Sequence, residues 1–218
     1  MNKFQFFVNN ETPKILCLGA HADDIEIGCG GTILKIVKEY PKSEFRWIVF
    51  AAKGKRVKEA HQSANSFLTE IKSKVIDVQM FKDSYFPFVG AAIKDYFVKL
   101  KEEFSPDLVL THYSNDAHQD HQLLAQLTWN AFRNNLILEY EIVKYDADLG
   151  IPNLYVHLNE SLVQRKISNI CERFQSQIEK EWFGEETFRS IMRIRGIESN
   201  SPSKYAEAFY CRKIVVGC

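Results

Sequence analysis

One stretch near the start of the chain, ILCLGAHADDIEIGCGGT at residues 15–32, most restricts the fold. It begins with an apolar run at residues 15–18, which is typical of a strand buried on both faces of a sheet. His21, Asp23 and Asp24 follow this run, and glycines then lead into an apolar pattern of helical period. The stretch therefore predicts a strand, a polar loop and a helix, with the polar residues at the carboxyl end of the strand, where open α/β sheets bind ligands.

The rest of the chain alternates between short apolar runs and segments of helical period. The predicted strands are 45–52, 75–80, 107–110, 141–145, 153–158 and 206–216, and the predicted helices are 57–71, 91–104, 123–132, 161–178 and 185–194. This alternation predicts an α/β fold, a single Rossmann-like domain with a mostly parallel sheet and helices on both faces. We expect the domain to span residues 1–218, with residues 1–12 as a loose N-terminal arm.

The composition limits the classes of partner. The 28 basic and 28 acidic side chains balance, which gives no electrostatic support for nucleic acid or an anionic membrane surface as the main partner. No apolar segment reaches the length of a membrane span, and the first residues lack the apolar core of a secretory signal. The five cysteines form no CxxC pair, which argues against a disulfide framework. We therefore expect a cytoplasmic protein without an integral membrane segment.

A second polar cluster, THYSNDAHQDH at residues 111–121, follows the predicted strand at 107–110. Because the carboxyl ends of parallel strands open onto one edge of a sheet, we expect the two clusters to share a pocket. His21 and Asp24 from the first cluster and His121 from the second would then supply three ligands. Catalytic zinc uses three protein ligands and keeps a fourth position open.

Other residues of the two clusters are candidate acid–base groups. Asp23 lies beside a predicted ligand and is a candidate general base. His118 is a candidate general acid or oxyanion stabiliser, and Asp120 or Asp116 could orient its ring. In the alternative arrangement, the aspartates cap the following helix and the histidines are partly buried hydrogen-bonding residues. Spacing alone does not choose between the two.

Four short motifs occur in chain order: AHADDIE at residues 20–26, RVKEA at 56–60, DAHQDH at 116–121 and YAEAF at 205–209. Together they resemble the zinc-dependent PIG-L/LmbE-type de-N-acetylases, which include bacterial N-acetylglucosaminyl deacetylases. The corresponding family patterns are approximately A-H-P-D-D-E, R-x-x-E-A, D-x-H-x-D-H and Y-A-E-A-F. Here an alanine replaces the motif proline and the motif glutamate is displaced by one position, but neither change removes a predicted ligand.

The resemblance implies roles for individual residues. It implies Zn²⁺ on His21, Asp24 and His121, a set that also accepts other divalent transition metals. It implies Asp23 as general base and His118 as acid or oxyanion partner, supported by Asp120. It also suggests that Arg56 and Glu207 bind substrate, although Glu207 could equally be a surface residue of an edge strand. We interpret His112 as a near-core histidine rather than a group that supports the site.

The resemblance further implies the reaction. A zinc-dependent hydrolase of this kind removes the N-acetyl group from an N-acetylated amino sugar or its conjugate, giving acetate and a free amine. Whether the chain forms a homo-oligomer stays open. One alternative is a non-catalytic, family-derived protein that binds sugar or metal without turnover. Another is a Rossmann-type nucleotide-binding enzyme, but the glycine spacing is not GxGxxG and no P-loop lysine is present.

Overall fold

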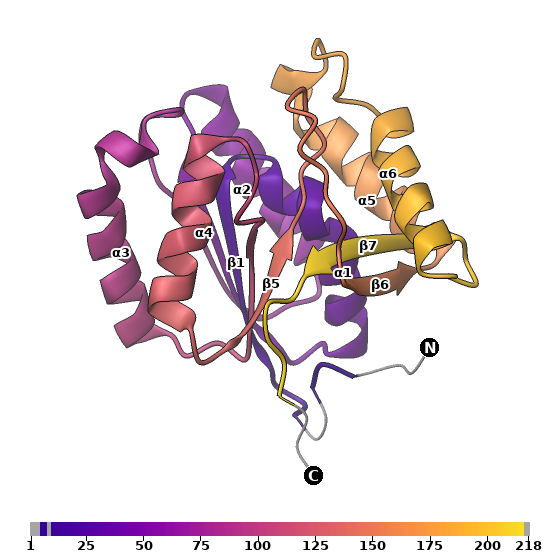
Figure 1. Cartoon of the computed structure of the whole chain (residues 1–218), viewed down its shortest axis with the longest axis horizontal. Helices are drawn as coiled ribbons and strands as arrows, with labels where there is room; N and C mark the ends of the chain where they lie inside the picture. Colours follow the sequence, from indigo (N-terminus) through magenta and orange to yellow (C-terminus); the bar gives the residue numbers. More distant parts are fainter. Residues whose placement is uncertain (1–4, 8–9, 216–218) are drawn as a thin grey trace.

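Figure 1 shows a computed structural model of the chain, in which residues 5–7 and 10–215 are described. Within those residues, one seven-stranded sheet lies between two layers of helices. The strands are β1 (Lys14–His21), β2 (Glu44–Ala51), β3 (Ser73–Val78), β4 (Leu108–His112), β5 (Leu136–Tyr140), β6 (Leu154–Leu158) and β7 (Tyr205–Tyr210). The helices are α1 (Asp24–Glu39), α2 (Lys55–Phe67), α3 (Gly90–Glu103), α4 (Gln119–Phe132), α5 (Glu160–Arg173) and α6 (Glu185–Glu198), with short 3-10 helices η1 (Phe86–Phe88) and η2 (Gln175–Gln177).

The strand order of the sheet is β3-β2-β1-β4-β5-β7-β6. The first five strands in this order are parallel, while β7 pairs antiparallel with both β5 and β6. The chain moves from β1 outward to β2 and β3, and then continues from β4 to β5 on the other side. The order therefore reverses between β1 and β4, and such a reversal opens a crevice at the carboxyl ends of the two strands. The mostly parallel sheet with helices on both faces confirms the predicted fold class.

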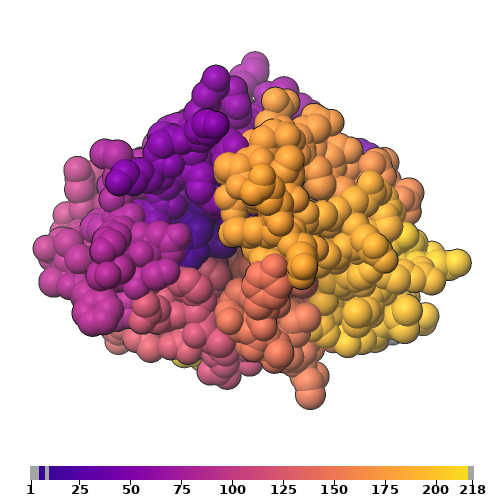
Figure 2. Space-filling view, turned by 90° about the horizontal axis from the view of Figure 1, so that it is seen from above, coloured from indigo at the N-terminus to yellow at the C-terminus, as the bar shows by residue number. Residues whose placement is uncertain are grey.

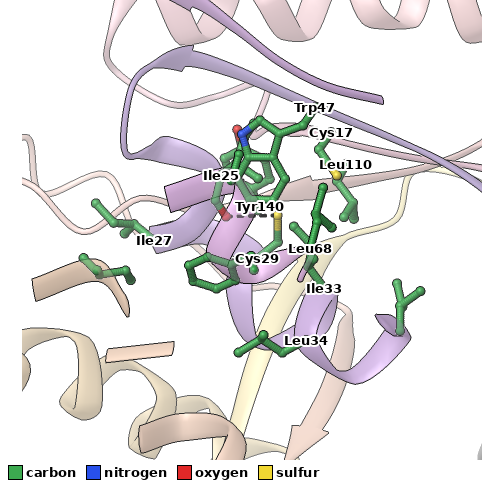
Figure 3. Close-up of a cluster of buried hydrophobic side chains, with 14 of the residues drawn as sticks. Cys17, Ile25, Ile27, Cys29, Ile33, Leu34, Trp47, Leu68, Leu110 and Tyr140 are labelled. Atoms are coloured by element: carbon green, nitrogen blue, oxygen red, sulfur yellow. Dashed lines mark hydrogen bonds between the residues drawn. The ribbon is translucent and has the colours of Figure 1, made fainter. Parts of the chain in front are cut away.

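Both faces of β1 are buried, which explains why its sequence is an apolar run rather than an alternating pattern. Ile15 and Cys17 belong to a core covered by α1, α2, α5 and α6, whereas Leu16 and Leu18 belong to a core covered by α3 and α4. Figure 3 shows part of the first core, where the indole of Trp47 lies among side chains of β1, β4 and α1. The two cores hold β1 in the middle of the sheet and fix the position of its carboxyl end.

One predicted strand, at residues 141–145, is wrong, and β5 lies immediately before it. A charged residue concealed β5, because Glu139 is buried inside the strand and accepts hydrogen bonds from the backbone N–H and hydroxyl of Ser114 (2.8 and 2.7 Å). Residues 141–145 (EIVKY) combine apolar and charged side chains but form a loop, in which Glu141 pairs with Arg195 instead of facing solvent.

Other element ends also differ from the sequence prediction. Helix α1 begins at Asp24, so the glycines lie inside the helix rather than before it. Helix α5 ends at Arg173, short of the predicted end at residue 178, and β7 ends at Tyr210, short of residue 216. Strand β7 is an inner strand of the sheet, between β5 and β6, and not an edge strand.

Part of the predicted N-terminal arm, residues 1–4 and 8–9, lies outside the described residues, as do residues 216–218. Phe7 is buried, and its ring packs edge-on against that of Tyr40 with 5.2 Å between centroids. The extent of the domain stays a prediction. In the described part of the chain, no helix combines the length and apolar character that a membrane span needs.

Candidate active site

The two polar clusters meet at the crevice between β1 and β4. His21 is the last residue of β1, Asp24 the first residue of α1, and His121 lies in the first turn of α4, which follows β4. His21 and His121 are 100 residues apart in sequence, yet their ring nitrogens are 3.2 Å apart. Figure 2, which looks down on this edge, shows the indigo N-terminal segment at the floor of a hollow between purple and orange segments.

Three atoms from these residues form a nearly equilateral triangle. His21 Nδ1 lies 3.2 Å from His121 Nε2 and 3.4 Å from Asp24 Oδ2, and His121 Nε2 lies 3.5 Å from the same oxygen. For tetrahedral zinc with bonds of about 2.0–2.1 Å, ligand atoms are separated by about 3.3–3.4 Å. The three atoms therefore have the chemistry and the mutual spacing that a metal ion requires.

Each histidine of the triangle holds its second ring nitrogen against a carboxylate. His121 Nδ1 is 2.9 Å from Asp116 Oδ2, while His21 Nε2 is 3.3 Å from Asp120 Oδ2 and 3.2 Å from Asp83 Oδ1. Such a carboxylate fixes the tautomer and the direction of a ligating histidine. The inner nitrogens of both rings are thereby left to act as acceptors toward the centre of the triangle.

The carboxylate of Asp24 accepts a backbone hydrogen bond and lies among histidine rings. Its Oδ2 accepts a hydrogen bond from the backbone N–H of His21 (2.6 Å) and lies 3.2 Å from His112 Nε2. Burial raises the pKa of Asp24, but His121, His112 and His21 outweigh burial and hold the pKa well below its usual range. Asp24 is therefore a carboxylate, the protonation state that a metal ligand needs.

Asp23 points to a different partner. Its Oδ1 accepts a 2.6 Å hydrogen bond from the guanidinium of Arg56, at the start of α2. Burial raises the pKa of Asp23, and the opposing effect of Arg56 does not cancel the increase. A buried carboxylate with a raised pKa is a stronger proton acceptor than an ordinary aspartate, which suits a general base.

His118 is the N-cap of α4, and its ring lies beside both histidines of the triangle. The centroid distances are 4.9 Å to His21 and 4.6 Å to His121. His118 Nδ1 accepts the backbone N–H of Asp120 (3.2 Å), so the neutral ring carries its proton on Nε2. Burial and the neighbouring His121 and His21 lower the pKa of His118. The ring is thus oriented to donate a hydrogen bond from Nε2.

The described residues contain more than one set of ligand atoms that a metal ion could use. One such set combines Asp24, His112 and His121, and another combines His21, His118 and His121. His112 is the weaker ligand, because its Nε2 already accepts the backbone N–H of Ala20 at 2.9 Å. Whichever combination is used, this buried group of histidines and aspartates can hold a metal ion.

The family model described as "PIG-L: GlcNAc-PI de-N-acetylase" matches residues 16–132, which include both polar clusters and Arg56. The chain belongs to this family.

Solved structures share its fold. The N,N'-diacetylchitobiose deacetylase from Pyrococcus horikoshii matches with a TM-score of 0.67 and 23% identity, over 90% of this chain and 82% of that one. A teicoplanin deacetylase in its zinc-inhibited form matches with a TM-score of 0.67 and 14% identity, over 90% and 97%. The 4-carboxy-2-hydroxymuconate hydratase from Pseudomonas putida matches with a TM-score of 0.66 and 16% identity, over 95% and 99%. The PIG-L fold therefore occurs with more than one reaction.

The structure brings most of the predicted residues of this PIG-L chain together but changes one pairing. Asp120 does not hold the ring of His118 with its carboxylate. Its Oδ2 contacts His21 and accepts the backbone N–H of Ser84 (2.6 Å), while Oδ1 accepts that of Phe86 (3.0 Å). The carboxylate therefore ties η1 and the segment before it to the triangle, and only the backbone N–H of Asp120 reaches His118.

Glu207 lies away from the triangle. Its carboxylate is 3% exposed and is bonded to two backbone N–H groups of α1 and to Lys166. This geometry does not favour direct contact with a substrate.

Sequence reasoning undervalued three residues near the site. His112 is fully buried and stacks on His121 with 3.9 Å between ring centroids, so it supports the site rather than the core alone. Its position at the end of β4 was the available signal. Asp83 and Lys144 belong to no recognisable motif, and only the tertiary structure places them beside His21 and Asp116, respectively.

Proposed function

We propose that this protein is a zinc-dependent hydrolase that removes the N-acetyl group from an N-acetylated amino sugar or its conjugate. Membership of the PIG-L family and the deacetylases among the structural neighbours support a deacetylase. The observation that carries the proposal is the triangle of His21, Asp24 and His121, with both imidazoles backed by carboxylates and with Asp23 and His118 beside it.

His21 Nδ1, Asp24 Oδ2 and His121 Nε2 would hold the zinc ion. When bound, zinc supplies a Lewis acid that polarises the acetamide carbonyl and lowers the pKa of water to about 7. Nitrogen and carboxylate donors also suit iron and cobalt, so the donor set does not select zinc by itself.

Asp23 and His118 would move the protons. Asp23 accepts the proton of the attacking water; Arg56 already occupies its Oδ1, which leaves Oδ2 for the proton. The neutral His118 ring would donate a hydrogen bond from Nε2–H to the developing oxyanion. The proton that Asp23 takes from water would pass to the nitrogen of the leaving amine, either directly or through His118, which acts as the acid once it has been protonated. The products are acetate and a primary amine.

The test is the release of primary amine and acetate from a panel of N-acetylated substrates. The panel contains free N-acetylhexosamines, nucleotide sugars and glycosides, each assayed with zinc-loaded and with chelator-stripped protein. We expect zinc-dependent release of equal amounts of amine and acetate from at least one compound. A folded protein that binds no metal and releases neither product would refute the proposal.

The same panel separates the alternatives. A sugar-binding or metal-binding protein without turnover would bind zinc and release no amine, and a nucleotide-binding enzyme would not need zinc to bind its ligand. The nucleotide-binding alternative does not explain why both histidines of the triangle are backed by buried carboxylates.

A further inference from the structure

Helix α1, which begins with Asp24, is interrupted in its middle. Cys29 has φ −142° and ψ 15°, which is not a helical conformation, so α1 consists of a first piece before Cys29 and a second piece after it. At such a break, N–H groups after it and carbonyl groups before it lose their partners within the helix. Residues 24–34 are all buried, so water cannot replace those partners.

Glu207 and Lys166 supply the missing partners from two other elements. Glu207, on β7, accepts the backbone N–H groups of Gly31 and Thr32 at 2.7 and 2.6 Å. Lys166, on α5, donates to the backbone carbonyl of Ile27 (2.6 Å) and to Glu207 Oε1 (2.7 Å). The carboxylate therefore caps the second piece of α1, and the ammonium group caps the first. Both charged side chains are buried, at 3% and 2% exposure.

The break also lets the first piece pack directly against β5. A Cβ on Gly28 would lie 2.1 Å from the ring of Tyr140, so only glycine permits this approach. The Tyr140 hydroxyl donates to the carbonyl of Leu18 (2.6 Å) and lies 3.3 Å from His112 Nε2. The break at Cys29 thus sets how α1 sits on the strands that carry the site.

We propose that Glu207 and Lys166 are positioning residues for the metal-binding group, acting through the break in α1. The proposal rests on the function proposed above and assigns Glu207 a role different from substrate binding. The first piece is about 7 Å long at 1.5 Å per residue, and a tilt of about 10° at Cys29 would move Asp24 by about 1.3 Å. Metal sites tolerate deviations of only about 0.2 Å in ligand distances.

A piece this short does not hold its own direction, because isolated helices below about 12 residues are marginal in water. The Glu207–Lys166 pair fixes that direction from outside the helix. It does so without contacting Asp23, Asp24 or any histidine of the site. Asp24 Oδ2 consequently stays within reach of both His21 Nδ1 and His121 Nε2.

The experiment compares Glu207→Gln with Glu141→Gln. Glu141 also forms a buried pair, with two 2.7 Å hydrogen bonds from Arg195, but neither Glu141 nor Arg195 is hydrogen-bonded to α1. Glu141→Gln is therefore a matched control for the stability lost when a buried ion pair is broken. Zinc affinity is measured by competition with a chromogenic chelator, kcat and KM are measured on a substrate from the panel, and amide hydrogen exchange is measured on zinc-free protein.

We expect Glu207→Gln to weaken zinc binding by about 10- to 100-fold, the range seen when groups that orient metal ligands are removed. We expect kcat to fall with little change in KM, and exchange at Gly31 and Thr32 to accelerate in the zinc-free protein. Glu141→Gln should lose stability while its zinc affinity and the exchange rates of α1 stay at wild-type values.

Glu207→Asp covers the case in which Glu207→Gln does not fold. Aspartate keeps the negative charge beside Lys166 but is too short to reach both N–H groups, so we expect folded protein with weakened zinc binding and faster exchange in α1. Wild-type zinc affinity in folded Glu207 variants would overturn the proposal, even with faster exchange. Wild-type protein that binds no zinc and releases no acetate would refute the proposed function itself. If the wild-type enzyme is active and the Glu207 variants keep its zinc affinity, only the positioning role is refuted.

Discussion

Replacing Asp116 with asparagine tests whether the carboxylates behind the histidines support metal binding. Asp116 is 2% exposed. Its Oδ2 lies 2.9 Å from His121 Nδ1 and 3.1 Å from Lys144 Nζ. Its Oδ1 accepts a hydrogen bond from the backbone N–H of His118 (2.8 Å). Asparagine has the same shape but no charge and only one acceptor oxygen. It therefore cannot accept from both the His121 ring and the His118 backbone, and it leaves Lys144 with one fewer anionic partner.

We expect the Asp116→Asn variant to bind zinc about 10- to 100-fold more weakly, which corresponds to about 1.4–2.8 kcal/mol. Exchanging charge-assisted hydrogen bonds for neutral ones should also lower the free energy of unfolding by about 1–2 kcal/mol. The first loss concerns the direction and basicity of His121, and the second concerns the buried network of Asp116 itself.

The assay is chelator competition for zinc on the folded variant, together with chemical denaturation of the zinc-free protein. Asp148→Asn is the matched control, because Asp148 also pairs with Lys144 and accepts the backbone N–H of Ala117 but contacts no histidine. The control should lose stability and keep its zinc affinity. Wild-type zinc affinity in folded Asp116→Asn, or an equal loss of affinity in Asp148→Asn, would refute the reasoning.

Three further predictions concern catalysis, metal binding and packing. Asp23→Asn should keep its zinc content and lose activity by about 10²- to 10⁴-fold. The control Asp95→Asn, on the exposed face of α3, should stay active. Near-wild-type turnover in Asp23→Asn would exclude Asp23 as the base. Zinc at about 100 times its dissociation constant should stabilise the stripped protein by about 2.7 kcal/mol, visible as a higher Tm, and an unchanged Tm would contradict a specific site. Gly28→Ala should lower the free energy of unfolding by about 1–3 kcal/mol, because the added Cβ clashes with Tyr140. The control Gly184→Ala, where a Cβ meets nothing, should lower it far less in the same denaturation experiment.

The location of the site could be predicted because its proposed ligands lie close to buried strands in the sequence. Strands buried on both faces appear as short apolar runs, and the polar residues after them lie at the carboxyl edge of the sheet. His21 and Asp24 follow β1 within a few residues, and His121 follows β4. The central strands β1, β2 and β4 were recognised for the same reason.

The pairing of side chains across the site was decided by the tertiary structure. Asp120 is adjacent in sequence to His121 and close to His118, yet its carboxylate contacts His21, 99 residues away. Glu207 caps backbone N–H groups at Gly31 and Thr32, about 175 residues earlier in the chain. Such partners depend on which strands lie side by side, and the local sequence does not contain the strand order.

Burial explains where sequence reasoning went wrong. Glu139 hid β5. The loop that follows looked like a strand because it holds Ile142 and Val143, although its charged residues Glu141 and Lys144 are paired within the structure. Polarity in a sequence indicates solvent exposure only when the polar groups are hydrated, and here they are paired with other buried groups. The sequence alone therefore determined the family, the fold class and the ligands predicted for the metal, since these depend on local patterns. Only the tertiary structure decided which carboxylates orient those ligands and what holds α1 in place, because both depend on contacts between distant segments.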